Sequence, residues 1–303
     1  MWSLLRLLPP SLLTFIKRHT PARLRFAIRQ SLGADYRSIP DKVTAAPDGR
    51  LFHIGPDPIY WAIYHGLEYE PEATGIVRAI LRDGDIVVDI GANTGWYTTL
   101  CAQVVGPDGH VYAFEPVPST RARLDENIAI NHLSQRVTVI EKAVGSVPGG
   151  TATIHLFNDR SPALASLAPI GTAEFVPVPV AVTTLAEFAT DHGVRRIDFL
   201  KCDVEGAELE VLKGARPLLI GPDAPLILIE LNAETSRAFG HTKQDLMRLL
   251  EEVGYRRFFD IASAKSLRPV RGPRDLDAMD LMLCGKDPQT DDRLAASRLA
   301  VAD

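Results

Sequence analysis

Short runs of apolar residues alternate with longer segments of mixed polarity from about residue 72 onward. Five runs are apolar enough to predict buried strands, and they cover residues 85–90, 110–115, 136–144, 196–204 and 224–231. Four segments have the polar and apolar spacing of helices, and they cover residues 96–105, 118–132, 206–219 and 242–253. Strands that alternate with helices predict an α/β fold, in which helices cover both faces of a mostly parallel sheet.

The middle and the end of the chain depart from this alternation. Residues 151–157 and 174–182 have strand-like patterns, and a predicted loop, 158–173, separates them. Residues 255–261 and 280–286 predict two more strands. We therefore divide the chain into a basic, leucine-rich N-terminal extension (1–45), one domain (46–287) and a flexible polar tail (288–303).

The first 34 residues are basic and contain no acidic residue. Their positive charges are Arg6, Lys17, Arg18, Arg23, Arg25 and Arg29. No apolar run in this segment approaches the ~20 residues that span a bilayer, and prolines interrupt the apolar part, unlike in a signal peptide. Two interpretations remain open. The segment is either a basic amphipathic helix in peripheral contact with an anionic membrane or a partner, or a helical cap that packs on the domain.

The net charge and the number of cysteines indicate which partners and which cellular compartment to expect. A net charge of −5 lacks the basic excess of a general nucleic-acid binder, so we expect no nucleic-acid partner. The three cysteines, Cys101, Cys202 and Cys284, form no C-x-x-C pair, which favours a reducing compartment and no structural zinc. We expect a cytoplasmic protein, with a peripheral membrane association if the N-terminal segment makes one. The oligomeric state leaves no signal in the sequence.

The loop that follows the first predicted strand is the strongest candidate for a ligand site. Its pattern is Asp-x-Gly-x-Asn-x-Gly, from Asp89 to Gly95. A pyrophosphate loop needs G-x-G-x-x-G, but Asn93 and Trp96 occupy the second and third glycine positions here. The Walker pattern for ATP is absent as well. NAD and ATP are therefore not expected.

Two acidic residues favour a cationic nucleotide. Glu115 ends the second predicted strand, where an acid can accept hydrogen bonds from both ribose hydroxyls of an adenosine. Asp89 places negative charge at the mouth of the loop, which would repel a pyrophosphate but attract a cation. S-adenosylmethionine carries an ammonium, a sulfonium and no phosphate, so the charges favour that cofactor.

Several motifs together resemble the FkbM-type S-adenosylmethionine-dependent methyltransferases. They are "VVDIGANTGWYT" (87–98), "FEP" (114–116), "AVG" (143–145), "DFLKCDVEGAELEVLKGA" (198–215) and "LIE" (228–230), and "YEPEATGIVRAILRDGD" (69–85) is similar to the family's lead-in. The resemblance covers about residues 60–260. It implies a class I methyltransferase (Rossmann-like) fold, with seven strands of which the last is antiparallel. Two features depart from the family pattern: Ala186 replaces the aspartate of T-L-D, and the serines Ser161 and Ser166 are spread apart instead of forming a close pair. Because this middle segment is expected to contact the acceptor, the acceptors of relatives are not carried over to this chain.

The loop, the strand ends and the resemblance give a list of expected cofactor-binding residues: Asp89, Gly91, Ala92, Asn93, Gly95, Tyr97, Glu115, Ala143, Val144 and Asp203. The candidate catalytic residues are Asp203, Glu205 and His241, since a hydroxyl acceptor needs a base near the methyl donor. His65 is another candidate base. We expect Lys201 to pair with an acid on its face of the strand, and Trp96 to pack in the core.

A metal centre is not favoured, but one alternative set of ligands exists. Asp203, Glu230 and Asn232 lie at two neighbouring strand ends and could bind Mg²⁺. We hypothesise a methyltransferase that acts on a hydroxyl of a sugar, a glycolipid or a small metabolite, with a small-molecule or a glycan- or lipid-linked acceptor. The alternatives are a catalytically inactive S-adenosylmethionine-binding or scaffold protein of the same fold and an oxidoreductase on a Rossmann sheet, the latter disfavoured by the missing glycines.

Overall fold

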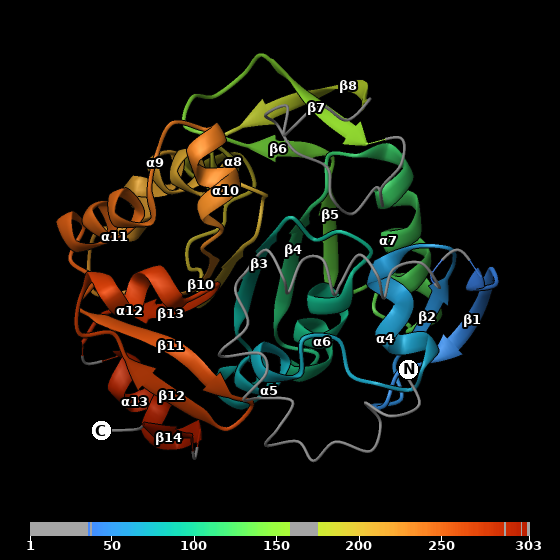
Figure 1. The fold of residues 1–303 in the computed structure, drawn as a ribbon, viewed down its shortest axis with the longest axis horizontal. Helices are drawn as coiled ribbons and strands as arrows, with labels where there is room; N and C mark the ends of the chain where they lie inside the picture. Colours follow the sequence, from blue (N-terminus) through green and yellow to red (C-terminus); the bar gives the residue numbers. More distant parts are fainter. Residues whose placement is uncertain (1–35, 37, 158–174, 288, 298, 302–303) are drawn as a thin grey trace.

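A computed structural model describes residues 36, 38–157, 175–287, 289–297 and 299–301. Its centre is a nine-stranded sheet (Figure 1). The strands, in the order in which they lie side by side, are β14 (Ala300–Val301), β12 (Ser266–Pro269), β11 (Arg257–Ser263), β13 (Leu281–Gly285), β10 (Leu226–Glu230), β9 (Phe199–Cys202), β3 (Ile86–Ile90), β4 (His110–Phe114) and β5 (Val137–Ile140). The N-terminal helical extension expected over 1–34 and the loop 158–173, including Ser161 and Ser166, lie outside the described residues.

The strand directions confirm the predicted class I methyltransferase fold, but the sheet has nine strands instead of the expected seven, because β12 and β14 extend it beyond β11. β5, β4, β3, β9 and β10 are parallel neighbours, whereas β13 is antiparallel to both β10 and β11. The chain moves outward in one direction from β3 to β5, and then returns to start again at β9 on the other side of β3. Ligands of open α/β sheets bind at the carboxyl ends of the strands where the order reverses. The expected site therefore lies at the ends of β3 and β9.

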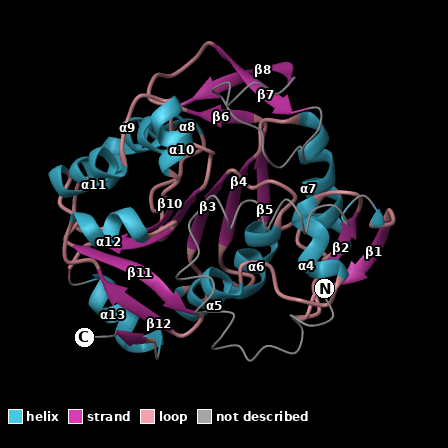
Figure 2. Ribbon diagram, viewed as in Figure 1, coloured by secondary structure: helices cyan, strands magenta, loops and turns pink. Residues whose placement is uncertain are grey.

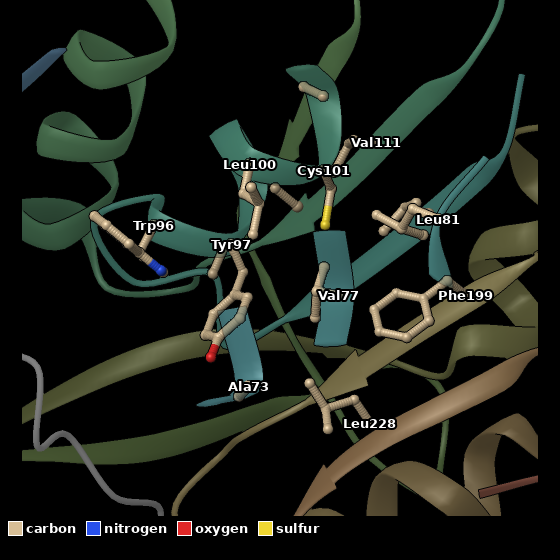
Figure 3. Close-up of a cluster of buried hydrophobic side chains, with 14 of the residues drawn as sticks. Ala73, Val77, Leu81, Trp96, Tyr97, Leu100, Cys101, Val111, Phe199 and Leu228 are labelled. Carbon is tan, nitrogen blue, oxygen red and sulfur yellow. The ribbon is translucent and has the colours of Figure 1, made fainter. Parts of the chain in front are cut away.

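Helices cover both faces of the sheet (Figure 2). One face packs against α5 (Pro71–Ile80), α6 (Trp96–Val104), α7 (Pro118–Ile130) and α13 (Gln289–Ser297). The other face packs against α8 (Leu185–Asp191), α9 (Glu208–Leu219), α11 (Lys243–Glu252) and α12 (Pro273–Ala278). In the first layer, Val77 of α5 and Cys101 of α6 lie near Phe199 of β9, as Figure 3 shows. Trp96 belongs to this core, as predicted.

Local sequence signals account for several helix starts. α5 and α7 begin with a proline, whose fixed backbone angle suits the first helical position. The Thr184 side chain accepts a hydrogen bond from Glu187 N at the start of α8, and Thr242 and Asp245 form a capping box at α11. Two short elements, the 3₁₀ helix η2 (Pro58–Tyr60) and α4 (Trp61–Tyr64), precede α5, and α10 (Ala233–Ala238) follows β10.

The strand predicted over residues 136–144 is divided between two sheets. β5 ends at Ile140, and β6 (Lys142–Val144) continues in a three-stranded sheet with β8 (Phe175–Thr183) and β7 (Thr151–Phe157). β8 pairs with β6 in parallel and with β7 in antiparallel orientation. Because β5 is the edge of the main sheet, its chain can leave there and pair elsewhere.

Both ends of the described chain add structure to the predicted domain. β1 (Lys42–Ala45), which lies inside the expected extension, forms an antiparallel hairpin with β2 (Leu51–Ile54). At the other end, the prediction of a flexible tail from residue 288 was wrong for α13 and β14. Arg293 of α13 is buried and forms ion pairs with Asp85 and Asp198, which come just before β3 and β9. None of the helices in the described ranges is long and apolar enough to cross a membrane.

Candidate functional site

The loop after β3 adopts a conformation that its small residues permit. Gly91, Asn93 and Gly95 all have positive φ angles, of 79°, 52° and 93°. A Cβ atom at Gly91 would lie 1.9 Å from the carbonyl oxygen of Asp203, so only glycine fits between this loop and the end of β9. The Ala92 N–H donates to the carbonyl of Phe114, 3.0 Å away, which ties the loop to the end of β4. The loop thus connects three strand ends.

Glu115, the acid after β4, braces the same loop. Its Oε2 accepts a hydrogen bond from Asn93 N at 2.9 Å, and its Oε1 accepts one from Val117 N at 3.0 Å. The residue is only 6% exposed, and burial raises the pKa of the Glu115 carboxyl to about 7, although both backbone hydrogen bonds oppose that rise. Each oxygen keeps a second lone pair, so Glu115 can also accept hydrogen bonds from a ligand.

A buried charge cluster lies beneath the loop. Thr98 Oγ1 donates to Asp89 Oδ2 at 2.6 Å, and Lys201 Nζ lies 3.8 Å from Asp89 Oδ1. Lys201 Nζ also donates to Asp203 Oδ2 at 3.0 Å, which confirms the predicted pairing of this lysine. Burial alone would lower the pKa of Lys201, but Asp203 and Asp89 raise it above its usual value. Lys201 therefore stays charged and neutralises part of the acidic site.

Tyr97 covers this cluster from the first turn of α6. Lys201 Nζ lies 4.9 Å from the centroid of its ring, a cation–π contact. The Tyr97 hydroxyl donates to Glu70 Oε2 at 2.7 Å, so the polar end of the ring is directed to the start of α5. Burial raises the pKa of the Tyr97 hydroxyl well above its usual value, which keeps it a neutral donor.

Three carboxylates meet at the ends of β9 and β10. Oxygen atoms of Asp203, Glu205 and Glu230 lie within 4.8 Å of one another. Burial, together with the negative charges of Asp203 and Glu205, raises the pKa of Glu230 well above its usual value. These are the residues that could hold a divalent cation. Asn232, the third ligand of the sequence-based alternative, is instead the N-cap of α10, where its side chain accepts from Glu234 N at 3.0 Å.

Sequence reasoning missed Glu208, which is fully buried beside this group. Its Oε1 accepts hydrogen bonds from Val204 N and Gly206 N, both at 3.1 Å. The motif K-x-D-x-E-G-A-E contains Glu208 as its last letter. Its place in the motif gave no sign of burial, because acids are common in the first turn of a helix, where they are usually exposed to solvent.

The candidate base His241 is buried, and it faces the protein rather than an open cleft. It is 6% exposed, and its Nε2 donates to the carbonyl oxygen of Gly206 at 2.8 Å. His65, the other histidine considered, stacks on Trp61 at the end of α4 and hydrogen-bonds the Trp61 carbonyl through Nδ1. Asp203, whose side chain is 31% exposed, is more accessible than His241, and Glu205 is partly exposed as well.

Ala143 and Val144 lie in a neighbouring pocket instead of the Gly91 loop. The pocket opens between β6, β8 and the start of α9, and most of its lining is apolar. Its residues are Ala143, Val144, Gly145, Ser146, Val147, Ala152, Val182, Ala207, Glu210 and Phe239. Ser146 Oγ donates to Glu210 Oε2 at its polar side. The predicted site residues thus form a polar centre around Asp89, Glu115 and Asp203, with an apolar pocket at its edge.

Sheet order, strand-end loop and acidic residues together define a class I methyltransferase. A sequence profile of the methyltransferase FkbM domain matches residues 89–257, more than half of the chain. The chain belongs to the FkbM methyltransferase family.

Comparison with individual proteins agrees with this membership. The chain is 31% identical to the methyltransferase sdnD of Sordaria araneosa, over 45% of this chain and 62% of that protein. It is 31% identical to the 31-O-demethyl-FK506 methyltransferase FkbM of Streptomyces tacrolimicus, over 44% of this chain and 60% of that protein. Both matches thus span less than two thirds of the relative.

Two further comparisons are more distant in sequence. The hexuronic acid methyltransferase AglP of Haloferax volcanii is 28% identical over 58% of this chain and 67% of that protein. A crystal structure of a methyltransferase FkbM from Methylobacillus flagellatus has a TM-score of 0.42 and 19% identity, and it covers 74% of this chain and 52% of that chain.

Proposed function

We propose that this protein is an S-adenosylmethionine-dependent methyltransferase that methylates a hydroxyl group of a sugar, a glycolipid or a small metabolite. The observation that carries the proposal is the meeting of the Gly91 loop, Glu115 and the Asp203 turn at the point where the strand order reverses. Support for this class of acceptor comes from the names of two relatives, which refer to 31-O-demethyl-FK506 and to hexuronic acid.

The hydrogen-bond acceptors and the charges at the site fit this cofactor. Glu115 has lone pairs for the ribose hydroxyls, and Asp89 Oδ1 is buried without a hydrogen-bond partner among the described residues. Four carboxyl groups, of Asp89, Asp203, Glu205 and Glu230, lie near Lys201 among the described residues of the site. Burial raises the pKa of Asp89 and of Glu230, and a ligand with positive charge and no phosphate would favour their ionised forms. S-adenosylmethionine would supply a methyl group that its positive sulfur has already made electrophilic.

The task left to the chain is to orient the acceptor and to take its proton. Asp203 is a partly exposed carboxylate of the site, and its ion pair with Lys201 fixes its orientation. We assign Asp203 as the base for the acceptor hydroxyl and Glu205 as its neighbour on the acceptor side. The apolar pocket edged by Val147 and Phe239 can bind the non-reacting body of the acceptor and exclude water.

Calorimetric titration tests the cofactor first. The protein should bind S-adenosylmethionine and its demethylated product, but not NAD. The double variant Asp89→Ala, Glu115→Ala should lose this binding, whereas Glu251→Ala, Glu252→Ala on the exposed side of α11 should retain it. If the native protein binds neither compound, the Gly91 loop does not bind this cofactor, and only the fold would remain common to this protein and the methyltransferases.

A screen with labelled methyl groups separates the enzyme from an inactive scaffold. Pools of sugars, glycolipids and small hydroxylated metabolites are incubated with the protein and the labelled cofactor, and transfer should require Asp203. A protein that binds the cofactor but labels no pool would favour the alternative, a catalytically inactive S-adenosylmethionine-binding protein of the same fold.

We further propose that transfer needs no divalent cation, because Lys201 already pairs with Asp203 and Asn232 is used as a helix cap. Enzyme dialysed against EDTA should keep its activity within about twofold, and added Mg²⁺ should not increase it. A loss of more than tenfold in activity after EDTA treatment, with activity restored by Mg²⁺ in the native protein but not in Glu230→Gln, would instead establish a metal at the three carboxylates.

A further inference from the structure

The turn between β9 and α9 has a backbone conformation that needs external support. It runs from Asp203 to Ala207, and Glu205 within it has a φ of 52°. A non-glycine residue in the left-handed region costs about 1–2 kcal/mol, so neighbouring contacts must hold it there. The next residue, Gly206, has a φ of 108° and is closely packed, because a Cβ atom would lie 2.7 Å from the carbonyl oxygen of Thr235.

Two buried side chains form hydrogen bonds with the backbone of this turn. Glu208 Oε1 accepts the N–H groups of Val204 and Gly206, each at 3.1 Å, and His241 Nε2 donates to the Gly206 carbonyl at 2.8 Å. Glu208 is 0% exposed and His241 is 6% exposed, so water competes little for these hydrogen bonds. We call Glu208, Gly206 and His241 the Gly206 clamp.

The turn held by the Gly206 clamp packs directly against the loop that is expected to bind the cofactor. The Asp203 carbonyl, which begins the turn, packs directly against Gly91, and no atom larger than hydrogen fits between them. Asp203 N also donates to the carbonyl of Ile90 at 3.1 Å, immediately before Gly91. A turn that relaxes would therefore displace the Gly91 loop as well as the Asp203 carboxylate.

We propose that Glu208 is a positioning residue for methyl transfer, which sets cofactor affinity by accepting the backbone N–H groups of the Asp203–Ala207 turn. The inference rests on the proposed function and adds to it a residue that touches neither cofactor nor acceptor. Its role depends on a hydrogen-bond acceptor at Oε1 and not on negative charge. Consistent with this, burial raises the pKa of the Glu208 carboxyl, which favours its neutral form.

The test compares Glu208→Ala with Glu208→Gln, because glutamine keeps the acceptor oxygen and removes the charge. The matched control is Glu187→Ala, which removes another first-turn glutamate, in α8. Two quantities are measured in the full-length protein: hydrogen exchange of the amides in peptides covering residues 203–209, and the Kd for S-adenosylmethionine. Thermal unfolding verifies that each variant is folded.

In Glu208→Ala, exchange should accelerate at least tenfold and the Kd should rise about tenfold. Glu208→Gln should stay within about threefold of the native protein in both measurements, and Glu187→Ala should change neither. If Glu208→Ala does not fold, His241→Ala removes the other side of the clamp and should also raise the Kd, by at least threefold.

Three outcomes would overturn the inference. Faster exchange with an unchanged Kd would make Glu208 a structural residue only. Equal loss of affinity in the glutamine and alanine variants would show that the charge matters and the acceptor oxygen does not. A native protein with slow exchange in the turn but no affinity for S-adenosylmethionine would overturn the proposed function, and this inference with it.

Discussion

Glu115 connects cofactor binding to pH at the scale of a single residue. Its pKa of about 7 lies above the usual 4.5 for glutamate, so burial favours the protonated form. This group thus stabilises the folded protein fully below pH 4.5, and that contribution is lost as the pH rises through 7. Acceptance of two ribose hydroxyls requires the opposite, ionised form. Cofactor affinity should therefore increase as the pH rises through this range.

We predict that the Kd for S-adenosylmethionine is about tenfold higher at pH 6 than at pH 8. The Glu115→Gln variant should bind S-adenosylmethionine more weakly at both pH values. After correction for the ionisation of the cofactor itself, its Kd at pH 6 should nearly equal its Kd at pH 8. Calorimetry at half-unit intervals of pH measures both proteins. A native profile parallel to that of the variant would mean that Glu115 does not titrate in cofactor binding.

Gly91 provides a second prediction at this scale, with Gly49 as its control. Both have φ angles near +80°, but a Cβ atom at Gly91 would overlap the Asp203 carbonyl, whereas Gly49 in the β1–β2 turn has nothing within 4 Å. Gly49→Ala should lose about 1–2 kcal/mol of unfolding free energy from backbone strain. Gly91→Ala should lose at least about 2 kcal/mol more and bind no S-adenosylmethionine. Urea unfolding and calorimetry measure these effects, and equal losses in the two variants would contradict the close packing.

The sequence singles out candidate site residues that stand in a local pattern of strand and loop. It does not reveal residues that become neighbours only through the folded turn between β9 and α9. Asp89 lies near the end of β3, and Gly91 and Glu115 directly follow apolar strands, so the local pattern was enough to make them candidates. Glu208 was not among them, because an acid in the first turn of a helix is common, and its partners become neighbours only through the left-handed backbone at Glu205. The Gly206 partner of His241 lies 35 positions away in the sequence and was equally hidden.

At the scale of elements, apolar runs predicted seven strands of the main sheet but missed the short edge strands β12 and β14, and they did not reveal which strands pair. The run 136–144 has one continuous strand pattern, and only the pairing of β6 with β8 reveals that it divides. The helix α13 was missed for another reason. Its sequence, QTDDRLAAS, is mostly polar, and a single buried leucine, Leu294, together with the buried Arg293 connects it to the sheet.

Arg293 therefore gives the prediction for this element. Its guanidinium donates to Asp85 at 2.6 and 3.0 Å and to Asp198 at 3.3 Å, all buried. Arg293→Ala therefore leaves the buried Asp85 without its cation and Asp198 with only the exposed Arg196. The unfolding free energy should fall by about 3–5 kcal/mol. Arg257→Ala is the control, since Arg257 pairs with Asp287 and Asp291 at the surface and should cost less than about 1 kcal/mol. Similar losses for the two arginines in chemical unfolding would show that α13 contributes no more than a surface ion pair.

The charge of the whole molecule is divided unequally, which bears on where the protein acts. The chain has a net charge of −5, yet six of its 33 lysines and arginines lie in the first 34 residues, which have no acid. The rest of the chain is thus more acidic than the total suggests, and an anionic surface would attract the N-terminal segment while it repels the domain. The domain would therefore reach a lipid-linked acceptor at an anionic membrane only if residues 1–34 contact that membrane.

We propose that residues 1–34 make this contact, each basic side chain adding about 1 kcal/mol near an anionic surface. Full-length protein should float with vesicles of phosphatidylserine and phosphatidylcholine at low salt, and not with phosphatidylcholine alone. A chain that starts at residue 35 should stay at the bottom of the gradient with an unchanged Tm. A deletion that lowers the Tm by several degrees, in a full-length protein that never floats, would identify the segment as a cap on the domain. In that case the acceptor should be sought among freely diffusing metabolites.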